Sequence, residues 1–481
     1  MALKEKATAM VVKQGIKALQ KDFDKASVNM IELAEKKYAG DPLYAKILGG
    51  LKKALTTEGY VWREYLKSLV VDTDPKMLEK LVTPIMNAGF YSYETRKAAI
   101  EKYNCNIPWA ILIDPTAACN LKCTGCWAAE YGHQSQLSND DLNKIISEGK
   151  ELGTYVYLFT GGEPLMRKKD LLNLCEKNPD CLFLMFTNGT LCDDAFADEV
   201  KRVGNLLLIF SIEGNEETTD ARRGKGTYKA VTAAIKRLKD RNLIFGASLC
   251  YTKLNAEVIG SDEYADFLVD LGCRFAWYFS YMPIGNSAGP EILATAEQRK
   301  MMYDQIRKWR HRERKPLFTI DFFNDGEYVG GCIAGGKQYF HINSNGDCEP
   351  CVFCHYSTVN IKDPNTHLID VLRSPIFMAY RERQPFSDNM LRPCPIRDNP
   401  GAIVQMVKTT GAKSTDLVSP EDVEHLVSKT IDLAKEWKPV ADSMMQEHGF
   451  IKNMPRSMAM YQDVEVKHIH DFDEFNASVG E

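Results

Sequence analysis

Between residues 110 and 282 the chain repeats one pattern, in which a short apolar run is followed by an amphipathic stretch. The runs are almost continuously hydrophobic, which is typical of strands in a parallel sheet that is covered on both faces. The stretches between them carry apolar residues at helical spacing. The runs are AILID (110–114), TYVYLFT (154–160), CLFLMFT (181–187), NLLLIFS (205–211), IFGASLCYT (244–252) and RFAWYFSYM (274–282).

Six strand–helix units in series predict an α/β fold, either a parallel barrel or a doubly wound sheet. In both cases the ligand site is expected at the carboxyl ends of the strands. The pattern changes on either side of these units, so we expect four parts. They are a helical N-terminal extension (1–105), the α/β core (106–315), a turn-rich region with cysteines (316–400), and C-terminal helices with a tail (401–481).

Composition excludes several classes of protein. The 481 residues carry 60 basic and 65 acidic side chains, and the net charge of −5 argues against electrostatic binding of nucleic acid. No stretch approaches 18 apolar residues, so no transmembrane helix is expected. The first twenty residues contain several lysines and no apolar core, which excludes a secretory signal peptide.

The chain has 14 cysteines, and without an export signal a disulfide framework is not expected. Clustered cysteines in such a chain favour metal or redox chemistry. Four others stand singly in apolar segments, and we interpret them as small hydrophobic residues. These are Cys175, Cys181, Cys250 and Cys273.

Three cysteines form a C-x3-C-x2-C pattern directly after the first predicted strand, at Cys119, Cys123 and Cys126. A loop at this position can direct three thiolates at one centre, and thiolates suit iron–sulfur clusters or zinc. Three ligands would leave one iron of a four-iron cluster open for chemistry. A zinc site and chance clustering are the alternatives.

The same loop resembles the cluster-binding motif of the radical S-adenosylmethionine (SAM) superfamily. Further stretches at the ends of later strands resemble that superfamily as well. They are TGGEPL (160–165), TNGT (187–190), SIEG (211–214), DARRGKGTY (220–228) and MPIG (282–285). The resemblance implies that the core is a partial (β/α)6 TIM-type barrel.

The resemblance also implies the cofactors. A [4Fe-4S] cluster on the three cysteines would bind SAM, and reductive cleavage would give a 5′-deoxyadenosyl radical that abstracts hydrogen from an unactivated C–H bond. The electron donor would be a reduced ferredoxin or flavodoxin. Glu163 would hold the methionine ammonium, Glu213 the ribose, and Arg222 or Arg223 the carboxylate. The full set of implied SAM contacts is Gly161, Gly162, Glu163, Pro164, Asn188, Ser211, Glu213, Arg222, Arg223 and Ser248.

A second group of cysteines between residues 330 and 394 resembles the auxiliary-cluster region of the SPASM and twitch subgroups. The resemblance implies one auxiliary [4Fe-4S] cluster with Cys332, Cys351 and Cys394 as ligands. The fourth ligand is left open between Cys354 and Cys348, with His355 or an open site as further candidates. Residues 342–351 carry an Asn-Gly pair that predicts a hairpin. A zinc ribbon is the alternative.

The substrate is less constrained than the cofactors. The first hundred residues look helical and lack the β-wing of a leader-peptide module, which weakens a peptide substrate. The N-terminal helix is basic and amphipathic, so it would suit an anionic membrane surface and a lipid substrate, or it would pack on the barrel. Its pattern consists of Lys4, Lys6, Lys13, Lys17 and Lys21 among Leu3, Met10, Val11, Ile16 and Leu19.

The sequence therefore predicts a radical SAM enzyme that modifies a large lipid or peptide substrate. A dehydrogenase acting on a small alcohol and a non-catalytic iron–sulfur or zinc scaffold are the alternatives. Because both clusters would be sensitive to oxygen, we expect a reduced cytoplasm, with peripheral membrane contact if the substrate is a lipid.

Overall fold

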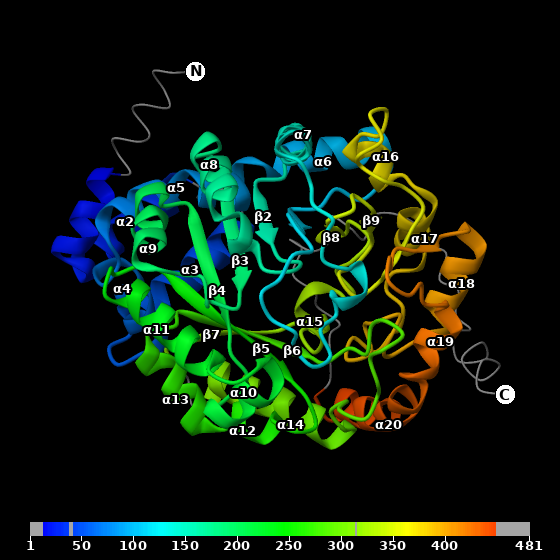
Figure 1. Ribbon diagram of the computed structural model, residues 1–481. Helices are drawn as coiled ribbons and strands as arrows, with labels where there is room; N and C mark the ends of the chain where they lie inside the picture. The colour runs from blue at the N-terminus through cyan, green and yellow to red at the C-terminus, as the bar shows by residue number, and fades with distance from the viewer. Residues whose placement is uncertain (1–12, 38–41, 313–314, 449–481) are drawn as a thin grey trace.

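The computed structural model describes residues 13–37, 42–312 and 315–448, and its core is a sheet of parallel strands with helices on the outside (Figure 1). All six predicted strands are present, each within two residues of its predicted bounds. They are β1 (Ala110–Ile113), β2 (Val156–Phe159), β3 (Leu182–Thr187), β4 (Leu206–Ser211), β5 (Phe245–Tyr251) and β6 (Phe275–Ser280). The predicted α/β fold of the partial-barrel type is confirmed.

Two more parallel strands extend this sheet at its edges. The strand order is β7-β6-β5-β4-β3-β2-β1-β8-β9, with β7 (Phe318–Asp321) at one edge. At the other edge β8 (Tyr339–Ile342) pairs in parallel with β1, and β9 (Cys348–Glu349) returns antiparallel to β8 as the predicted hairpin. The pairing of β1 with β8 therefore brings the second cysteine region beside the strand that leads into the first.

The register of the strands places one row of side chains on the inner face of the barrel. Ser211 of β4 pairs with Ser248 of β5, Ser248 pairs with Trp277 of β6, and Trp277 pairs with Ile320 of β7. Partners that are directly opposite in neighbouring strands point to the same face of a sheet. The row thus forms one wall that runs across four strands.

The helices of the core follow the strands and cover the outer face of the sheet (Figure 1). The first of them begins with a capping box, in which the Ser138 hydroxyl accepts from the backbone N–H of Asp141 and the Asp141 carboxylate accepts from that of Ser138. The series is α7 (Asn139–Leu152), α8 (Lys168–Lys177), α9 (Asp194–Val203), α10 (Glu216–Arg223), α11 (Thr227–Lys239), α12 (Ala256–Ile259), α13 (Asp262–Leu271) and α14 (Ala296–Arg307).

The described part of the N-terminal region is helical, as predicted. Residues 13–21 form a helix, on which Ile16 is buried and Leu19 packs against Phe23, Ile31 and Leu55. This packing agrees with a helix that lies on the protein, whereas Leu3, Lys4, Lys6, Met10 and Val11 fall outside the described residues. The other elements are α2 (Phe23–Lys37), α3 (Pro42–Thr56), α4 (Val61–Val71), α5 (Pro75–Met86), the π-helical η1 (Asn87–Tyr91) and α6 (Tyr93–Tyr103).

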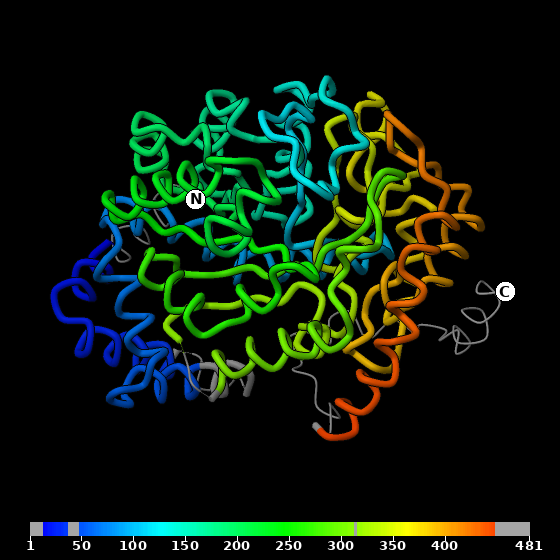
Figure 2. Tube along the Cα trace, turned by 60° about the horizontal axis from the view of Figure 1, so that its bottom comes forward, coloured from blue at the N-terminus to red at the C-terminus, as the bar shows by residue number. Residues whose placement is uncertain are grey.

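The chain after β7 forms short elements and a final group of helices. The N-terminal helices and these last helices lie at opposite ends of the molecule in both views (Figures 1 and 2). The predicted tail after residue 448 is outside the described residues, and the four-part division of the chain stays a prediction. The elements are α15 (Gly326–Val329), β10 (Tyr356–Ser357), α16 (Leu368–Leu372), α17 (Pro375–Arg383), α18 (Pro400–Thr410), β11 (Lys413–Ser414), α19 (Val423–Ser428) and α20 (Ile431–His448).

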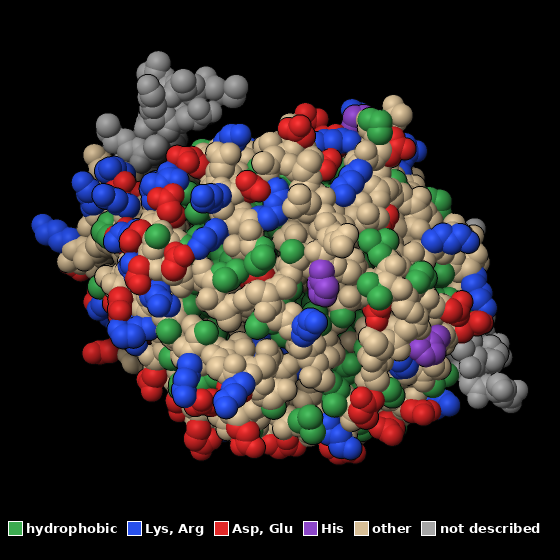
Figure 3. All heavy atoms as spheres, in the orientation of Figure 1, with side chains coloured by type: hydrophobic (Ala, Val, Ile, Leu, Met, Phe, Trp, Pro, Cys, Tyr) green, Lys and Arg blue, Asp and Glu red, His purple; other side chains and the backbone are tan. Residues whose placement is uncertain are grey.

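Acidic and basic side chains are interspersed around the face shown in Figure 3. Among the residues that the structure describes, no helix combines the length and the apolar character needed to cross a membrane.

Arg299 on α14 ties the barrel to the C-terminal segments. Its guanidinium, which is almost fully buried, donates to Asp398 Oδ1 at 2.6 Å and to Asn324 Oδ1 at 2.8 Å. It also donates to the backbone oxygen of Leu391 at 3.0 Å and lies 4.0 Å from the centre of the Trp437 ring. Removing one partner of a buried pair leaves the other charge without compensation, so this contact is costly to lose.

We therefore expect Arg299→Met to lower the free energy of unfolding by about 3–5 kcal/mol, because Asp398 would stay buried and, of the two cations beside it, would keep only the 3.3 Å contact to Arg397. Lys300→Met on the same helix is the matched control. Lys300 pairs with Asp304 at the surface, so its loss should cost less than about 1 kcal/mol. Chemical unfolding of both variants measures the difference, and equal effects would contradict this role for Arg299.

Candidate active site

The three cysteines of the first motif lie together in an irregular loop after β1. Cys119, Cys123 and Cys126 are each half-buried and none forms a disulfide. Burial raises the pKa of the Cys119 thiol to about 11, and the nearby Cys126 and Cys123 sulfurs raise it further. The loop has no regular structure of its own, so its shape depends on contacts with the ends of the next strands.

The turn after β2 contacts the start of this loop through its backbone. The N–H of Gly162 donates to Thr116 O at 3.0 Å, and the N–H of Glu163 donates to Ala118 O at 2.8 Å. A Cβ at position 162 would lie 2.3 Å from Ala118 O, which leaves no space for a side chain. Gly161 has a φ of +99°, which favours glycine. The two glycines are therefore required by this close approach.

The Glu163 carboxylate ties the ends of β2 and β3 together. Its Oε1 accepts from Leu165 N at 2.9 Å and from Thr187 Oγ1 at 2.7 Å, while Oε2 accepts from Asn188 N at 2.8 Å. A carboxylate offers about four acceptor sites, so these bonds leave about one. The direct contact to a methionine ammonium stays a prediction, and the structure gives Glu163 a supporting role within the turn.

The turn after β3 holds the residue that follows Cys119. Asn188 Nδ2 donates to Asn120 Oδ1 at 2.9 Å, and Asn120 Nδ2 donates to Thr190 Oγ1 at 2.7 Å. The two amides and the hydroxyl thus connect the TNGT turn with the cysteine loop. Pro164, also among the predicted contacts, begins the short 3-10 helix η3 (Pro164–Arg167) beside these turns.

Two arginines share one buried carboxylate at the end of β4. Glu213 Oε1 accepts from Arg222 Nη1 at 2.7 Å and from Arg223 Nε at 2.8 Å. Although burial opposes ionisation, Arg222 and Arg223 hold the pKa of Glu213 below its usual value. Arg223 Nη1 lies 3.9 Å from Cys123 Sγ, and Thr124 N donates to Arg222 O at 2.8 Å. Two cations against one carboxylate leave a positive charge that favours thiolates in the loop.

Glu213 therefore lies among protein donors rather than standing free for a ribose. Its Oε2 also accepts from Cys250 N at 3.0 Å. The ribose contact of Glu213 stays a prediction, as do those of Ser211 and Ser248, which are half-buried neighbours on the inner wall.

Cys250 is the residue of this site that the sequence interpretation missed, since it was taken for a small hydrophobic residue. Burial raises the pKa of its thiol to about 11, and Arg222, Glu213 and Cys126 are among the charged groups near it. It follows Ser248 by two positions on β5, so both side chains point to the same face. That alternation is the signal that would have identified it.

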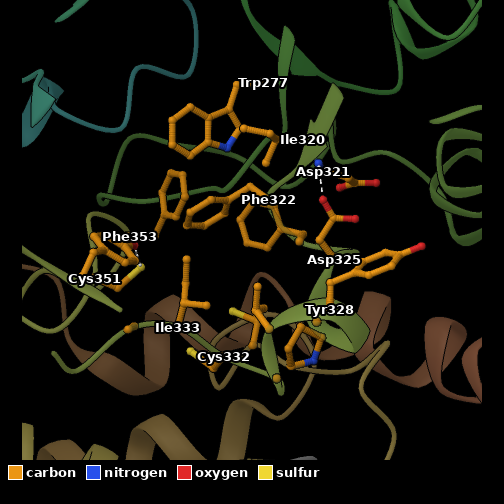
Figure 4. Close-up of a pocket in the computed structure, with 18 of the residues that line it drawn as sticks. Trp277, Ile320, Asp321, Phe322, Asp325, Tyr328, Cys332, Ile333, Cys351 and Phe353 are labelled. Atoms are coloured by element: carbon orange, nitrogen blue, oxygen red, sulfur yellow. Dashed lines mark hydrogen bonds between the residues drawn. The ribbon is translucent and has the colours of Figure 1, made fainter. Parts of the chain in front are cut away.

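Three cysteines of the second group lie near Tyr380, and a fourth, Cys394, lies near two of them. Burial raises the pKa of Tyr380, and Cys354, Cys332 and Cys351 raise it further. Cys394 belongs to the same group, because its sulfur lies near enough to raise the pKa of both Cys351 and Cys354. Three of these cysteines line one cavity, in which Cys332 and Cys351 lie near Ile333 (Figure 4).

Cys348 lies apart from this group. It pairs with Ile342 on β8, whereas its neighbour Glu349 pairs with His341, so the two side chains point to opposite faces of the hairpin. The alternative ligand His355 has protein contacts at both ring nitrogens in this structure, and its role as a ligand stays a prediction. Its Nδ1 lies 2.7 Å from Asp416 Oδ1 and its Nε2 lies 3.2 Å from Val352 O, which engages both ring nitrogens.

A buried cation beside Cys394 fits an anionic cluster at this position. The backbone N–H of Arg397 donates to Cys394 Sγ at 3.4 Å, and its guanidinium is fully buried. Within the described residues Nη1 and Nη2 of Arg397 have no hydrogen-bond partner. Arg397 Nε lies 3.3 Å from Asp398 Oδ1, which compensates part of this charge, and four thiolates with their cluster would place further negative charge near the two terminal nitrogens.

The donor geometry differs from that of a single metal ion. In the described ranges, no three His, Cys, Asp or Glu side chains gather closely enough to hold one ion. In a cluster each thiolate binds a different iron, so the sulfurs stand further apart than the ligands of one ion.

A buried network lies between the two cysteine groups. His341 Nε2 lies 2.9 Å from Asp114 Oδ1, and His341 Nδ1 lies 2.7 Å from Glu349 Oε2. The Tyr131 hydroxyl donates to the same Glu349 oxygen at 2.7 Å. Trp127, which follows Cys126, packs edge-on against His341 with ring centres 5.6 Å apart. The network therefore joins the first cysteine loop to the hairpin of the second group.

Gly162→Ala should displace the cysteine loop, because the new methyl group would collide with the backbone at Ala118. We expect the reconstituted variant to hold less iron and to melt at a lower temperature. Gly49→Ala is the control, since a Cβ there meets nothing within 4 Å and alanine is the better helix former. Iron analysis and thermal unfolding measure both effects, and a Gly162→Ala protein with full iron content would contradict the close packing.

Comparison with known proteins gives the family. The model of the radical SAM superfamily matches residues 113–260. An AdoMet-dependent heme synthase of Nitratidesulfovibrio vulgaris is 25% identical over 316 residues, which cover 58% of this chain and 82% of the relative. The sporulation killing factor maturation protein SkfB of Bacillus subtilis is 24% identical over 256 residues, covering 51% and 60%.

The fold is also similar to a solved structure. Streptococcus suis SuiB bound to S-adenosylmethionine superposes with a TM-score of 0.52 at 18% identity, covering 76% of this chain and 84% of SuiB. At that identity the likeness concerns the fold. The superfamily uses a [4Fe-4S] cluster and SAM, in agreement with the cofactors that the sequence predicted. Residues 113–260 are a radical SAM domain, and the chain that carries this domain is an enzyme.

Proposed function

We propose that this enzyme abstracts a hydrogen atom from an unactivated C–H bond of a large organic substrate. The observation that carries the proposal is the set of three gathered thiols, Cys119, Cys123 and Cys126, beside the Arg222–Glu213–Arg223 group. When bound there, the cluster and SAM supply a 5′-deoxyadenosyl radical, with one electron from a reduced ferredoxin or flavodoxin.

The residues of the chain hold and shield these reactants. The turns at Gly162 and Asn188 fix the loop that carries the thiols. The cation left over from Arg222 and Arg223 suits the SAM carboxylate, which a guanidinium binds with two parallel hydrogen bonds. Ser211 and Ser248 offer hydroxyls at the end of the inner wall for the ribose.

A second [4Fe-4S] cluster is proposed on Cys332, Cys351, Cys354 and Cys394. The position of three of them near Tyr380 and the buried Arg397 beside Cys394 support this set over one that includes Cys348. Four thiolate ligands would leave no open iron, so this cluster would exchange electrons with the substrate rather than bind it.

A peptide is a second candidate substrate. SkfB is named as a maturation protein of the sporulation killing factor, and this chain covers 60% of its length, while SuiB has been solved bound to the precursor peptide SuiA. The heme synthase is equally close in identity, so the relatives do not select one substrate class.

The test of the first cluster is Cys126→Ala. The variant should lose about four iron atoms per chain, keep the iron of the second site, and form no 5′-deoxyadenosine. Anaerobic incubation of the reduced, reconstituted wild type with SAM, followed by chromatography, should give 5′-deoxyadenosine. A wild type without this product would support the scaffold alternative, and a variant that still forms it would contradict the ligand assignment.

Cys354→Ala and Cys348→Ala form a matched pair for the second cluster. Both thiols are fully buried, so packing losses should be similar in the two variants. We expect Cys354→Ala to lose about four iron atoms and Cys348→Ala to keep them. Iron analysis of reconstituted proteins distinguishes the two, and the reverse result would make Cys348 the ligand.

A further inference from the structure

A cavity of about 440 Å³ lies between β6, β7 and the second cysteine group (Figure 4). This volume falls in the range of small-molecule sites, roughly 300–1,000 Å³. Cys332, Cys351 and Cys394 lie on one part of its wall, and side chains of β6 and β7 lie on another. The part near β6 and β7 is lined by the apolar side chains of Trp277, Ile320 and Phe322, and Ile333 and Phe353 add apolar surface beside the cysteines (Figure 4).

The charged side chains of the wall are engaged with other protein groups. Asp325 accepts from both terminal nitrogens of Arg310, at 2.7 and 2.6 Å. Asp321 accepts from Asn324 Nδ2 at 2.8 Å. A peptide in this space would bury backbone N–H and C=O groups against apolar side chains, which is costly without partners. A hydrocarbon chain has no such requirement and gains from leaving water.

The part of the cavity near β6 and β7 borders the inner wall of the barrel. Trp277 and Ile320 belong to the same row of side chains as Ser211 and Ser248, which lie at the proposed ribose site. The rings of Phe186 and Trp277 continue the apolar surface into the barrel, with ring centres 5.5 Å apart. A chain that lies along this wall would present its C–H bonds toward the SAM site.

Two large apolar residues lie at the surface where the cavity meets solvent. Phe318 is 48% exposed and Tyr328 is 42% exposed, and both line the cavity. Phe318 N donates to Arg274 O at 3.1 Å, and the Tyr65 hydroxyl of α4 donates to the same oxygen at 2.9 Å. The entrance thus lies beside α4, and its rim combines the apolar rings of Phe318 and Tyr328 with His311, whose Nε2 lies 3.1 Å from the Tyr328 hydroxyl.

We infer that this cavity binds the hydrocarbon chain of a lipid. The inference rests on the proposed function, because it names the substrate class of that reaction. Among the two substrate classes that the sequence left open, the lining of the cavity favours the lipid.

The test uses the reconstituted full-length protein under anaerobic conditions, without SAM or reductant. A palmitic acid analogue with a diazirine in its chain is bound, activated by light, and mapped by mass spectrometry. We expect labels in residues 318–333 and at Trp277, and we expect unlabelled palmitic acid to compete. An apolar peptide of alanine and leucine should not compete.

Ile320→Asp should weaken labelling about tenfold or more, because it places an unpaired carboxylate against the hydrocarbon. Ile320→Val keeps the wall apolar and should label like the wild type. Leu254→Asp, at a residue that is 73% exposed and outside the cavity, controls for an added charge. Circular dichroism and iron content check the folding of each variant.

Labels elsewhere in the wild type, competition by the peptide in place of palmitic acid, or unchanged labelling of folded Ile320→Asp would each overturn the inference. Because no SAM is present, these outcomes are separate from the 5′-deoxyadenosine assay. A wild type that binds the fatty acid and does not cleave SAM would instead contradict the proposed function.

Discussion

The cysteine loop keeps its shape through hydrogen bonds from the strand ends around it. The loop itself has no regular structure, yet three thiols can bind one iron–sulfur cluster only if the backbone holds them in place. The Glu163 N–H, the Asn188 amide and the carbonyl oxygen of Arg222 each contact a different point of the loop. Because β2, β3 and β4 are neighbours in one sheet, the sheet sets the positions of all three contacts. The positions of the three thiols therefore depend on how β2, β3 and β4 are aligned in the sheet.

The same sheet relates the two cysteine groups. β8 pairs with β1, so the hairpin that leads to Cys351 starts beside the strand that leads to Cys119. Between them His341 holds Asp114 and Glu349 on either side, with Trp127 packed against its ring. Buried charges of this kind are stable only as a complete set. The network therefore fixes the spacing between the two sites and closes this side of the barrel.

Much of the fold was predictable because the apolar runs and helix caps are local signals. The six strands and the Ser138 cap follow from them. The cysteine loop and the turns at 161–164 and 188 could also be identified from sequence. Partners that depend on tertiary contacts could not. Glu163 uses its carboxylate for hydrogen bonds at the ends of β2 and β3. Both ring nitrogens of His355 have protein contacts, and Cys348 points to the opposite face of the hairpin from Glu349. All three features depend on contacts between segments that are distant in sequence. Cys250 could be placed only in part, since its spacing of two residues from Ser248 on β5 indicates that both side chains point to the same face of the sheet.

The central claim is that three thiols hold an iron–sulfur cluster with one iron open to SAM. Electron paramagnetic resonance of the anaerobically reconstituted, dithionite-reduced protein tests it most directly. The account predicts the signal of a reduced [4Fe-4S] cluster whose g values shift when SAM is added to the wild type, and no such shift in Cys126→Ala. A wild-type spectrum that SAM leaves unchanged would contradict the account.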